Sequence, residues 1–299
     1  MRLSEVENEA GIAVRRDGDF QTLGFLCDSY PNQLVFLENR AFLRTLQRNR
    51  SVSAVLTTAE LADAVPGCLA VAICDQPRTA FANLHNQLAL RGFYWDDFPT
   101  VIDPSAKVHP TAWIAPRNVR IGAASEIAPN ATVLERCVIG ENVVVGAGCV
   151  LGGVGFQTVR SAEPMIEMNH AGGLLVESRA RILPGAVLAT GLFRQNTLIS
   201  EDVRVGSNAF VSHGVQLGRR VFVGHGSVIN GNVAVGSDSW IGPGAIVSQN
   251  LQIGEKAFVS LGAVVIRNLA VGARVSGNFA APHRRLLRML TTLNSGAGG

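Results

Sequence analysis

Residues 199–223 read ISEDVRVGSNAFVSHGVQLGRRVFV, and the pattern that they begin continues to residue 271. Every sixth residue of this stretch is aliphatic: Ile199, Val205, Val211, Leu217, Val223, Ile229, Val235, Ile241, Val247, Ile253, Val259, Val265 and Val271. An α-helix repeats every 3.6 residues and a strand every two, so neither sustains a period of six over so long a run. The pattern predicts short strands that turn a corner every six residues. Three such strands close a coil of about eighteen residues in a parallel β-solenoid of the hexapeptide class.

The same period begins earlier in the chain, with interruptions. It opens at Ile102, slips by one residue after Ile114, and runs from Ile121 to Leu151. Residues 152–173 then leave the pattern, and a shorter break follows at 191–197. A loop of the first length is usually either functional or disordered. Because it carries apolar residues, we expect it to fold over a substrate or a neighbouring subunit.

Residues 1–98 lack the six-residue period. Apolar runs at 33–37 and 52–56 predict strands, and 40–49 and 79–92 predict helices, which together indicate a small α/β domain. We therefore expect three parts: an α/β domain at 1–98, a β-solenoid at 99–278, and a C-terminal helix and tail at 279–299.

Composition narrows the function classes. The chain has 299 residues, of which 16% are charged and 32 are glycine, and its formal net charge is +3. So small a positive charge, without a Lys/Arg run, does not predict nucleic-acid binding. The five cysteines have no metal-ligand spacing, and the sequence shows neither a leader nor an apolar membrane span. We predict a cytoplasmic protein.

One histidine stands out on the predicted solenoid. His213 lies two residues after an inward valine, and Gly231 comes eighteen residues later, so the two are expected to stack in neighbouring coils. An imidazole can take a proton from an attacking amine or hydroxyl, and a backbone N–H can bind the oxyanion of an acyl transfer. The alternative is that His213, one of six histidines, is merely exposed, but the stacked glycine favours the catalytic role. His213 and His225 are twelve residues apart and no pair is closer, so we expect no metal site.

The N-terminal run from Phe36 to Phe42, the strand that follows it, and a solenoid with a Gly-x-Gly-Phe excursion carry a resemblance. Together they resemble the UDP-3-O-acylglucosamine N-acyltransferase family of lipid A biosynthesis, which belongs to the hexapeptide-repeat acyltransferases. The likeness covers nearly the whole chain in order and layout. It implies a left-handed parallel β-helix, a homotrimer with sites between subunits, and a nucleotide-sugar-binding domain at 1–98.

The resemblance also implies site residues. Phe36, Asn39 and Phe42 match the types and spacing with which the family clamps uracil, although Phe36 and Phe42 are equally well explained as core residues. His213 stands where the family has its catalytic histidine and Gly231 where it has its oxyanion-binding amide. Further substrate-binding candidates are Phe156, His170, Asn208 and Asn250.

Departures from the family surround the predicted base. Gly206 and Ser207 replace an Asp-Asn pair, Asn250 replaces a second histidine, and no carboxylate is evident to orient His213. An Asp-Arg-Gly signature is replaced by Ala189-Thr190-Gly191, and Ile-Pro-Gln-x-Gly by residues 168–172. These changes bear on the particular substrate more than on acyl transfer.

The end of the chain resembles another branch of the fold. Residues 276–282 are similar to the end of coenzyme A-dependent hexapeptide acetyltransferases, and Arg284, Arg285 and Arg288 follow. These arginines are predicted to bind an anionic donor, either acyl carrier protein or the phosphates of coenzyme A. An ordinary solvated basic surface is the alternative.

We thus expect an N-acyltransferase that moves an acyl group from an acyl carrier protein thioester to the amine of a UDP-linked amino sugar, with no bound cofactor. Two alternatives remain. One is a coenzyme A-dependent acetyl- or short-chain acyltransferase that modifies a sugar for a surface polysaccharide or a natural product. The other is a non-catalytic β-helix binding protein.

Overall fold

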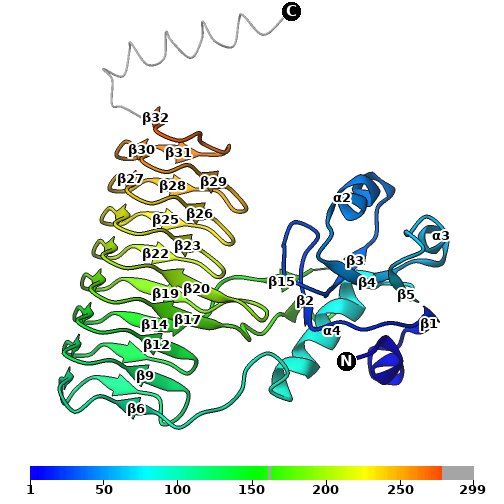
Figure 1. Cartoon of the computed structure of the whole chain (residues 1–299), viewed down its shortest axis with the longest axis horizontal. Coiled ribbons are helices and arrows are strands. Elements are labelled where there is room, and N and C mark those ends of the chain that lie inside the picture. The colour runs from blue at the N-terminus through cyan, green and yellow to red at the C-terminus, as the bar shows by residue number, and fades with distance from the viewer. Residues whose placement is uncertain (161–162, 278–299) are drawn as a thin grey trace, which may run out of the picture.

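The computed structural model describes residues 1–160 and 163–277, and two parts stand side by side in it (Figure 1). A column of short parallel strands forms one part, and an α/β domain at its flank forms the other. The predicted C-terminal helix and tail lie outside the described residues.

The column is a parallel β-helix with three faces. Face 1 contains β6 (Val101–Ile102), β9 (Val119–Ile121), β12 (Cys137–Ile139), β17 (Gly173–Val176), β20 (Asn196–Ile199), β23 (Gln216–Leu217), β26 (Ala234–Val235) and β29 (Gln252–Ile253). Face 2 contains β7 (Lys107–Val108), β10 (Glu126–Ile127), β13 (Val144–Val145), β18 (Arg181–Ile182), β21 (Arg204–Val205), β24 (Phe222–Val223), β27 (Trp240–Ile241), β30 (Phe258–Val259) and β32 (Arg274–Val275). Face 3 contains β8 (Trp113–Ile114), β11 (Thr132–Val133), β14 (Val150–Gly153), β19 (Val187–Ala189), β22 (Phe210–Val211), β25 (Val228–Ile229), β28 (Ile246–Val247) and β31 (Val264–Val265).

The six-residue period has a direct structural cause. Val211 pairs with Ile229 eighteen residues later, and the aliphatic residues from Ile199 to Val265 line one buried core. The second residue of most corners has a positive φ near 60°, as at Asn208, Asn232 and Asn250. Asn, Asp and Gly tolerate this left-handed conformation best, which explains their recurrence at that place.

The predicted inward position of Val271 was wrong. Val271 is 71% exposed, and Val275 pairs with Val259 only sixteen residues back. Leu269 likewise bridges to Ile253 sixteen residues back, so the last coil is two residues shorter than a regular coil and Leu269 takes the inward place predicted for Val271.

The N-terminal part is a five-stranded sheet with helices on both sides. The strand order is β1 (Ala13–Arg16), β5 (Ala70–Ile73), β4 (Val52–Thr57), β3 (Gln33–Leu37) and β2 (Thr22–Leu23), and only β1 is antiparallel to its neighbour. The helices are η1 (Leu3–Glu5), α1 (Glu7–Ala10), η2 (Arg40–Phe42), α2 (Leu43–Arg48), α3 (Ala59–Ala62) and α4 (Pro77–Leu90). The strands and helices predicted between residues 33 and 92 are confirmed to within two residues. Among the described residues no helix is long and apolar enough to span a bilayer.

Both breaks in the period join the two parts. The excursion forms an antiparallel hairpin of β15 (Thr158–Val159) and β16 (Ile166–Glu167), which packs on α4. Met168 of the excursion and Phe193 of the second break are buried in the N-terminal core, where Phe193 contacts Phe25 and Phe81. The α/β domain is therefore held against the column by an apolar core that residues from both parts share.

Candidate functional site

One corner of the β-helix faces the α/β domain. The excursion and the second break both leave the coil between face 3 and face 1, and in the next coils the same corner carries His213, Gly231 and Asn250. Stacking at intervals of eighteen residues brings these three turns into one line. The corner therefore combines the predicted catalytic residues with the two longest interruptions of the period.

His213 is held within this corner rather than standing free. It is 8% exposed, and its Nδ1 lies 3.2 Å from the hydroxyl oxygen of Ser212. The ring of His170 packs edge-on against it, with centroids 5.2 Å apart. Burial disfavours the charged imidazolium and lowers the pKa of His213, so the ring is a neutral base at neutral pH.

Gly231 lies directly against the other side of the imidazole. A Cβ at Gly231 would come within 2.5 Å of His213 Nε2, so a larger residue there would displace the ring. Within the described residues the Gly231 N–H has no acceptor, while its carbonyl oxygen accepts from the Asn250 N–H at 2.9 Å. A free N–H beside the base is the arrangement that an oxyanion site requires.

His170, a predicted substrate-binding residue, belongs to the wall behind His213. It is 5% exposed, and its Nε2 accepts a hydrogen bond of 3.0 Å from the Gly155 N–H. Burial lowers the pKa of His170 to about 4. His170, which belongs to the excursion, therefore packs behind His213 and does not line the cavity in front of that residue.

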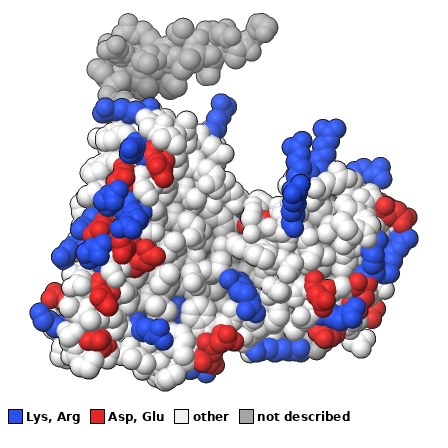
Figure 2. Space-filling view, viewed as in Figure 1, with Lys and Arg blue, Asp and Glu red and all other residues white. Residues whose placement is uncertain are grey.

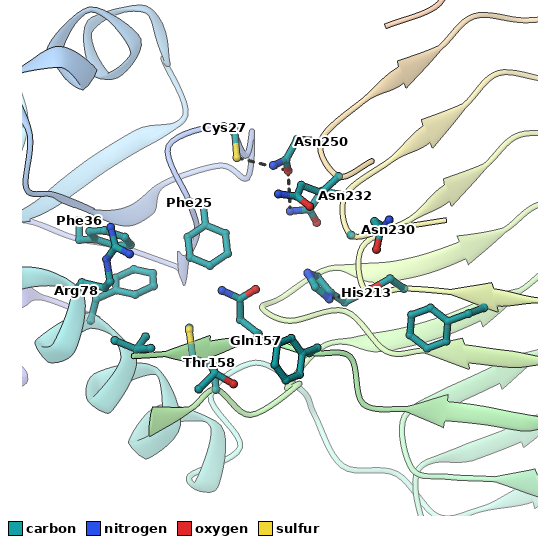
Figure 3. A pocket seen from close by; sticks show the side chains of 18 residues that line it. Phe25, Cys27, Phe36, Arg78, Gln157, Thr158, His213, Asn230, Asn232 and Asn250 are labelled. Carbon is teal, nitrogen blue, oxygen red and sulfur yellow. Dashed lines mark hydrogen bonds between the residues drawn. The ribbon is translucent and has the colours of Figure 1, made fainter. Parts of the chain in front are cut away.

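A cavity of about 520 Å³ opens in front of His213, between the corner and the α/β domain (Figure 3). His213 points into it from the β-helix, and Phe36 and Arg78 lie on the opposite wall. Phe156, predicted to bind substrate, also lines it and is 85% exposed. The other lining residues are Phe25, Cys27, Phe81, Gln157, Thr158, Val159, Met168, Phe210, Ser212, Asn230, Gly231, Asn232, Gln249 and Asn250.

A second cavity of about 500 Å³ adjoins the first on the α/β domain. It is lined by all three predicted uracil-binding residues, Phe36, Asn39 and Phe42. Phe42 is 54% exposed, and the Asn39 side-chain oxygen accepts from the Ala41 N–H at 2.8 Å. The two cavities share Phe25, Cys27, Phe36 and Arg78, so they form one cleft with His213 at one end and Phe42 at the other.

Arg78 lies where the two cavities meet. Its guanidinium carbon is 5.3 Å from the centre of the Phe36 ring, and its Nε lies 3.1 Å from a carboxylate oxygen of Glu38. Of the residues that line the His213 cavity, Arg78 alone carries a formal charge at neutral pH. The surface between the two parts is mainly uncharged, as Figure 2 shows. Nothing in the sequence pattern distinguished Arg78 from the other arginines.

A small polar contact closes one edge of the cleft. Cys27 Sγ lies 3.7 Å from the Asn250 side-chain oxygen, and Asn232 Nδ2 lies 3.4 Å from both Asp28 Oδ1 and Asn250 Oδ1. Burial raises the pKa of Asp28 to about 6. Asn250, predicted to bind substrate, therefore lines the cleft and also contacts the α/β domain.

Other predicted residues lie elsewhere. Asn208 is at the corner between faces 2 and 3 and does not line the cleft, and the corner histidine His225 there accepts from the Ser207 N–H at 2.9 Å. Arg284, Arg285 and Arg288 lie outside the described residues. Within those residues no group of three or more His, Cys, Asp or Glu side chains is placed to hold a metal ion.

Known proteins are similar to this chain in sequence. The model of the family "Bacterial transferase hexapeptide (six repeats)" matches residues 118–153 and 196–231, and the second match contains His213 and Gly231. A relative from Herminiimonas arsenicoxydans named UDP-3-O-acylglucosamine N-acyltransferase is 24% identical over 249 residues, covering 70% of each chain. A relative of the same name from Helicobacter pylori (strain ATCC 700392 / 26695) is 24% identical and covers 69% of this chain and 67% of its own. By these matches the chain is similar to the hexapeptide-repeat acyltransferases.

The transferase family model and the relatives named as N-acyltransferases indicate that the protein is an acyltransferase. Among solved structures, a UDP-N-acetylglucosamine acyltransferase from Campylobacter jejuni has a TM-score of 0.44 and 16% identity, and the match covers 64% of this chain and 83% of that one.

Proposed function

We propose that this acyltransferase moves an acyl group from a phosphopantetheine thioester to the amine of a UDP-linked amino sugar. The observation that carries the proposal is the continuous cleft. His213 and Gly231 lie at one end and Asn39 and Phe42 at the other, with Phe36 and Arg78 where the two cavities meet. A nucleoside diphosphate sugar has the same order of parts: base, phosphates, sugar.

The base end of the cleft suits a flat ring. Phe42 presents an exposed aromatic face, and Phe36 lies in the same cavity with Arg78 against its ring. Stacking between aromatic rings would hold uracil, and the amide of Asn39 is available to its polar edge. Arg78 would bind the diphosphate as a fork of N–H donors, in competition with Glu38.

The chemistry takes place at the other end. The sugar amine attacks the thioester carbonyl carbon, His213 Nε2 takes the amine proton, and the Gly231 N–H binds the oxyanion that forms. The carbon–sulfur bond then breaks, and the imidazolium returns its proton to the departing thiolate. The relatives named for UDP-3-O-acylglucosamine support this acceptor class. We propose acyl carrier protein as the donor, in line with the resemblance.

Calorimetry with UDP and UDP-N-acetylglucosamine tests the nucleotide site. Phe42→Ala should weaken UDP binding about tenfold, which corresponds to the loss of one stacking contact. Leu90→Ala truncates an even more exposed apolar residue at the end of α4 and should leave binding unchanged. The absence of UDP binding by the wild type would refute the sugar-nucleotide acceptor.

A phosphate series separates the role of Arg78 from that of the aromatic residues. Arg78→Ala should weaken UDP more than uridine, whereas Phe42→Ala should weaken both alike. An equal loss for uridine and UDP in Arg78→Ala would remove Arg78 from the phosphate role. Incubation with acyl carrier protein and coenzyme A thioesters in parallel identifies the donor, and faster turnover with coenzyme A would favour the alternative acyltransferase.

A further inference from the structure

The Nδ1 side of the His213 ring is closely packed. Ser212 is 5% exposed, and its Oγ lies 3.2 Å from His213 Nδ1. Gly155 of the excursion approaches so near that a Cβ there would lie 2.7 Å from the same Nδ1. Solvent therefore has little access to Nδ1, and the partner of that nitrogen comes from the protein.

His170 is excluded as the acceptor of an Nδ1 proton. Its Nε2 already accepts from the Gly155 N–H at 3.0 Å, and its low pKa keeps the ring neutral. Its ring meets His213 edge-on rather than along a hydrogen bond. The Ser212 hydroxyl is left as the group in contact with Nδ1.

The opposite side of the ring favours an unprotonated Nε2. This atom adjoins Gly231, whose N–H is a donor without an acceptor among the described residues. Among the described residues Nε2 has no hydrogen-bond acceptor for a proton, whereas a lone pair there faces the cleft. The two ring nitrogens thus have different surroundings, and these select one tautomer.

We propose that Ser212 is the positioning residue of His213: its hydroxyl oxygen accepts the Nδ1 proton and so directs the Nε2 lone pair at the acceptor. The inference rests on the proposed function and adds to it the group that orients the base. Carboxylates do this work in other histidine bases, where they also stabilise the imidazolium. A hydroxyl orients the ring without supplying a negative charge.

The proton balance of the step follows. The amine proton moves to Nε2 as the carbon–nitrogen bond forms. The imidazolium keeps its Nδ1 proton, which stays hydrogen-bonded to Ser212 Oγ. When the carbon–sulfur bond breaks, the Nε2 proton passes to sulfur and the starting tautomer returns. Ser212 neither gains nor loses a proton.

Three variants test the assignment kinetically. Ser212→Ala should lower kcat about ten- to a hundredfold, the effect of losing one hydrogen bond that orients a general base, with the KM for the sugar nucleotide unchanged. Ser212→Thr retains the hydroxyl and should recover most of the rate. Ser248→Ala is the control, because Ser248 occupies the same corner two coils further along, outside the cleft, and it should behave as wild type.

A spectroscopic measurement is independent of the substrate. In ¹⁵N-histidine-labelled protein, the nitrogen shifts of His213, assigned by their loss in His213→Gln, should show Nδ1 protonated and Nε2 free. In Ser212→Ala the two tautomers should become mixed. An Nε2-protonated wild type, or an unchanged kcat in Ser212→Ala, would overturn the assignment. UDP calorimetry decides the nucleotide site separately, so failure of one proposal is distinguishable from failure of the other.

Discussion

At the scale of single residues, the two corner histidines of neighbouring coils provide a matched comparison. His213 lines the cleft beside Gly231, whereas His225 lies at another corner and accepts from the Ser207 N–H. His213→Ala should lower kcat about a hundred- to ten-thousandfold because it removes the general base. His225→Ala should leave kcat unchanged, and UDP affinity should survive in both variants. Equal activity of the two variants in a steady-state assay would show that His213 is not the base.

Buried histidines also predict how stability depends on pH. Burial lowers the pKa of both His85 and His170 to about 4, from an ordinary 6.5. The unfolded chain therefore binds more protons between pH 6.5 and 4, so the stability that these groups contribute is complete above pH 6.5 and is lost as the pH falls through that window. The effect is on the order of 3 kcal/mol for each histidine.

Asp28 acts in the opposite direction. Its pKa is raised to about 6, so its burial costs stability above that pH and the cost is relieved as the pH falls. The two histidines lower stability as the pH falls, and only Asp28 opposes them. We therefore expect the free energy of unfolding, measured in urea, to decrease from pH 7 to pH 5. His170→Gln should make the decrease shallower. A stability that rises over this range would contradict the prediction.

At the scale of elements, the excursion hairpin is attached to the rest of the chain through α4. The Asn86 side chain donates to the Glu167 carbonyl oxygen at 2.8 Å and accepts from the Asn169 N–H at 2.8 Å. Asn86→Ala should cost about 1–3 kcal/mol and loosen the segment that carries His170. Hydrogen exchange should then be faster at residues 166–169 and kcat should be lower.

Asn83→Ala provides the control on the same helix. The Asn83 side chain is exposed and makes no hydrogen bond among the described residues, so this variant should show neither effect. If exchange in the hairpin were the same in both variants, the hairpin would be held by its apolar contacts alone.

Elements also show what the sequence could predict. The period of six predicts every face of the β-helix because each coil repeats the same local requirement, an aliphatic residue inward and a left-handed residue at the corner. The same period predicted that His213 and Gly231 stack in neighbouring coils. It did not reveal that Phe193 is buried with Phe25, or that Cys27 lies against Asn250, because these contacts join residues more than 150 positions apart and depend on how the two parts dock.

The site was accordingly predicted in pieces. The histidine, the glycine and the aromatic residues were recognisable by type and spacing, but their membership of one cleft was not. Ser212 was overlooked because a serine at a corner is ordinary in this fold, and only its distance from Nδ1 distinguishes it. Asn208 was chosen because it adjoins Gly206 and Ser207, the positions of the family's Asp-Asn pair, yet β22 separates its corner from that of His213.

At the scale of the whole molecule, the outward residues of face 3 indicate assembly. They are almost all apolar: Trp113, Thr132, Val150, Val187, Phe210, Val228, Ile246 and Val264. Trp113, Ile246 and Val264 are 51%, 42% and 53% exposed in the single chain. The outward row of face 2 is mixed: the charged residues Lys107, Glu126, Arg181 and Arg204 share it with the stacked rings of Phe222, Trp240 and Phe258. A continuous apolar row on a β-helix marks an interaction surface.

We expect face 3 to join three copies of the chain into a homotrimer. Light scattering should then give a mass of about 95 kDa, three times the 31.7 kDa of one chain.

Ile246→Arg places a charge on face 3, where pairing would bury it, and should give monomers because an unpaired buried charge is costly. Phe222→Arg makes the same change on face 2, in a row that already contains arginines, and should remain trimeric. A monomeric wild type would refute the assembly, and a trimeric Ile246→Arg would move the interface to another face.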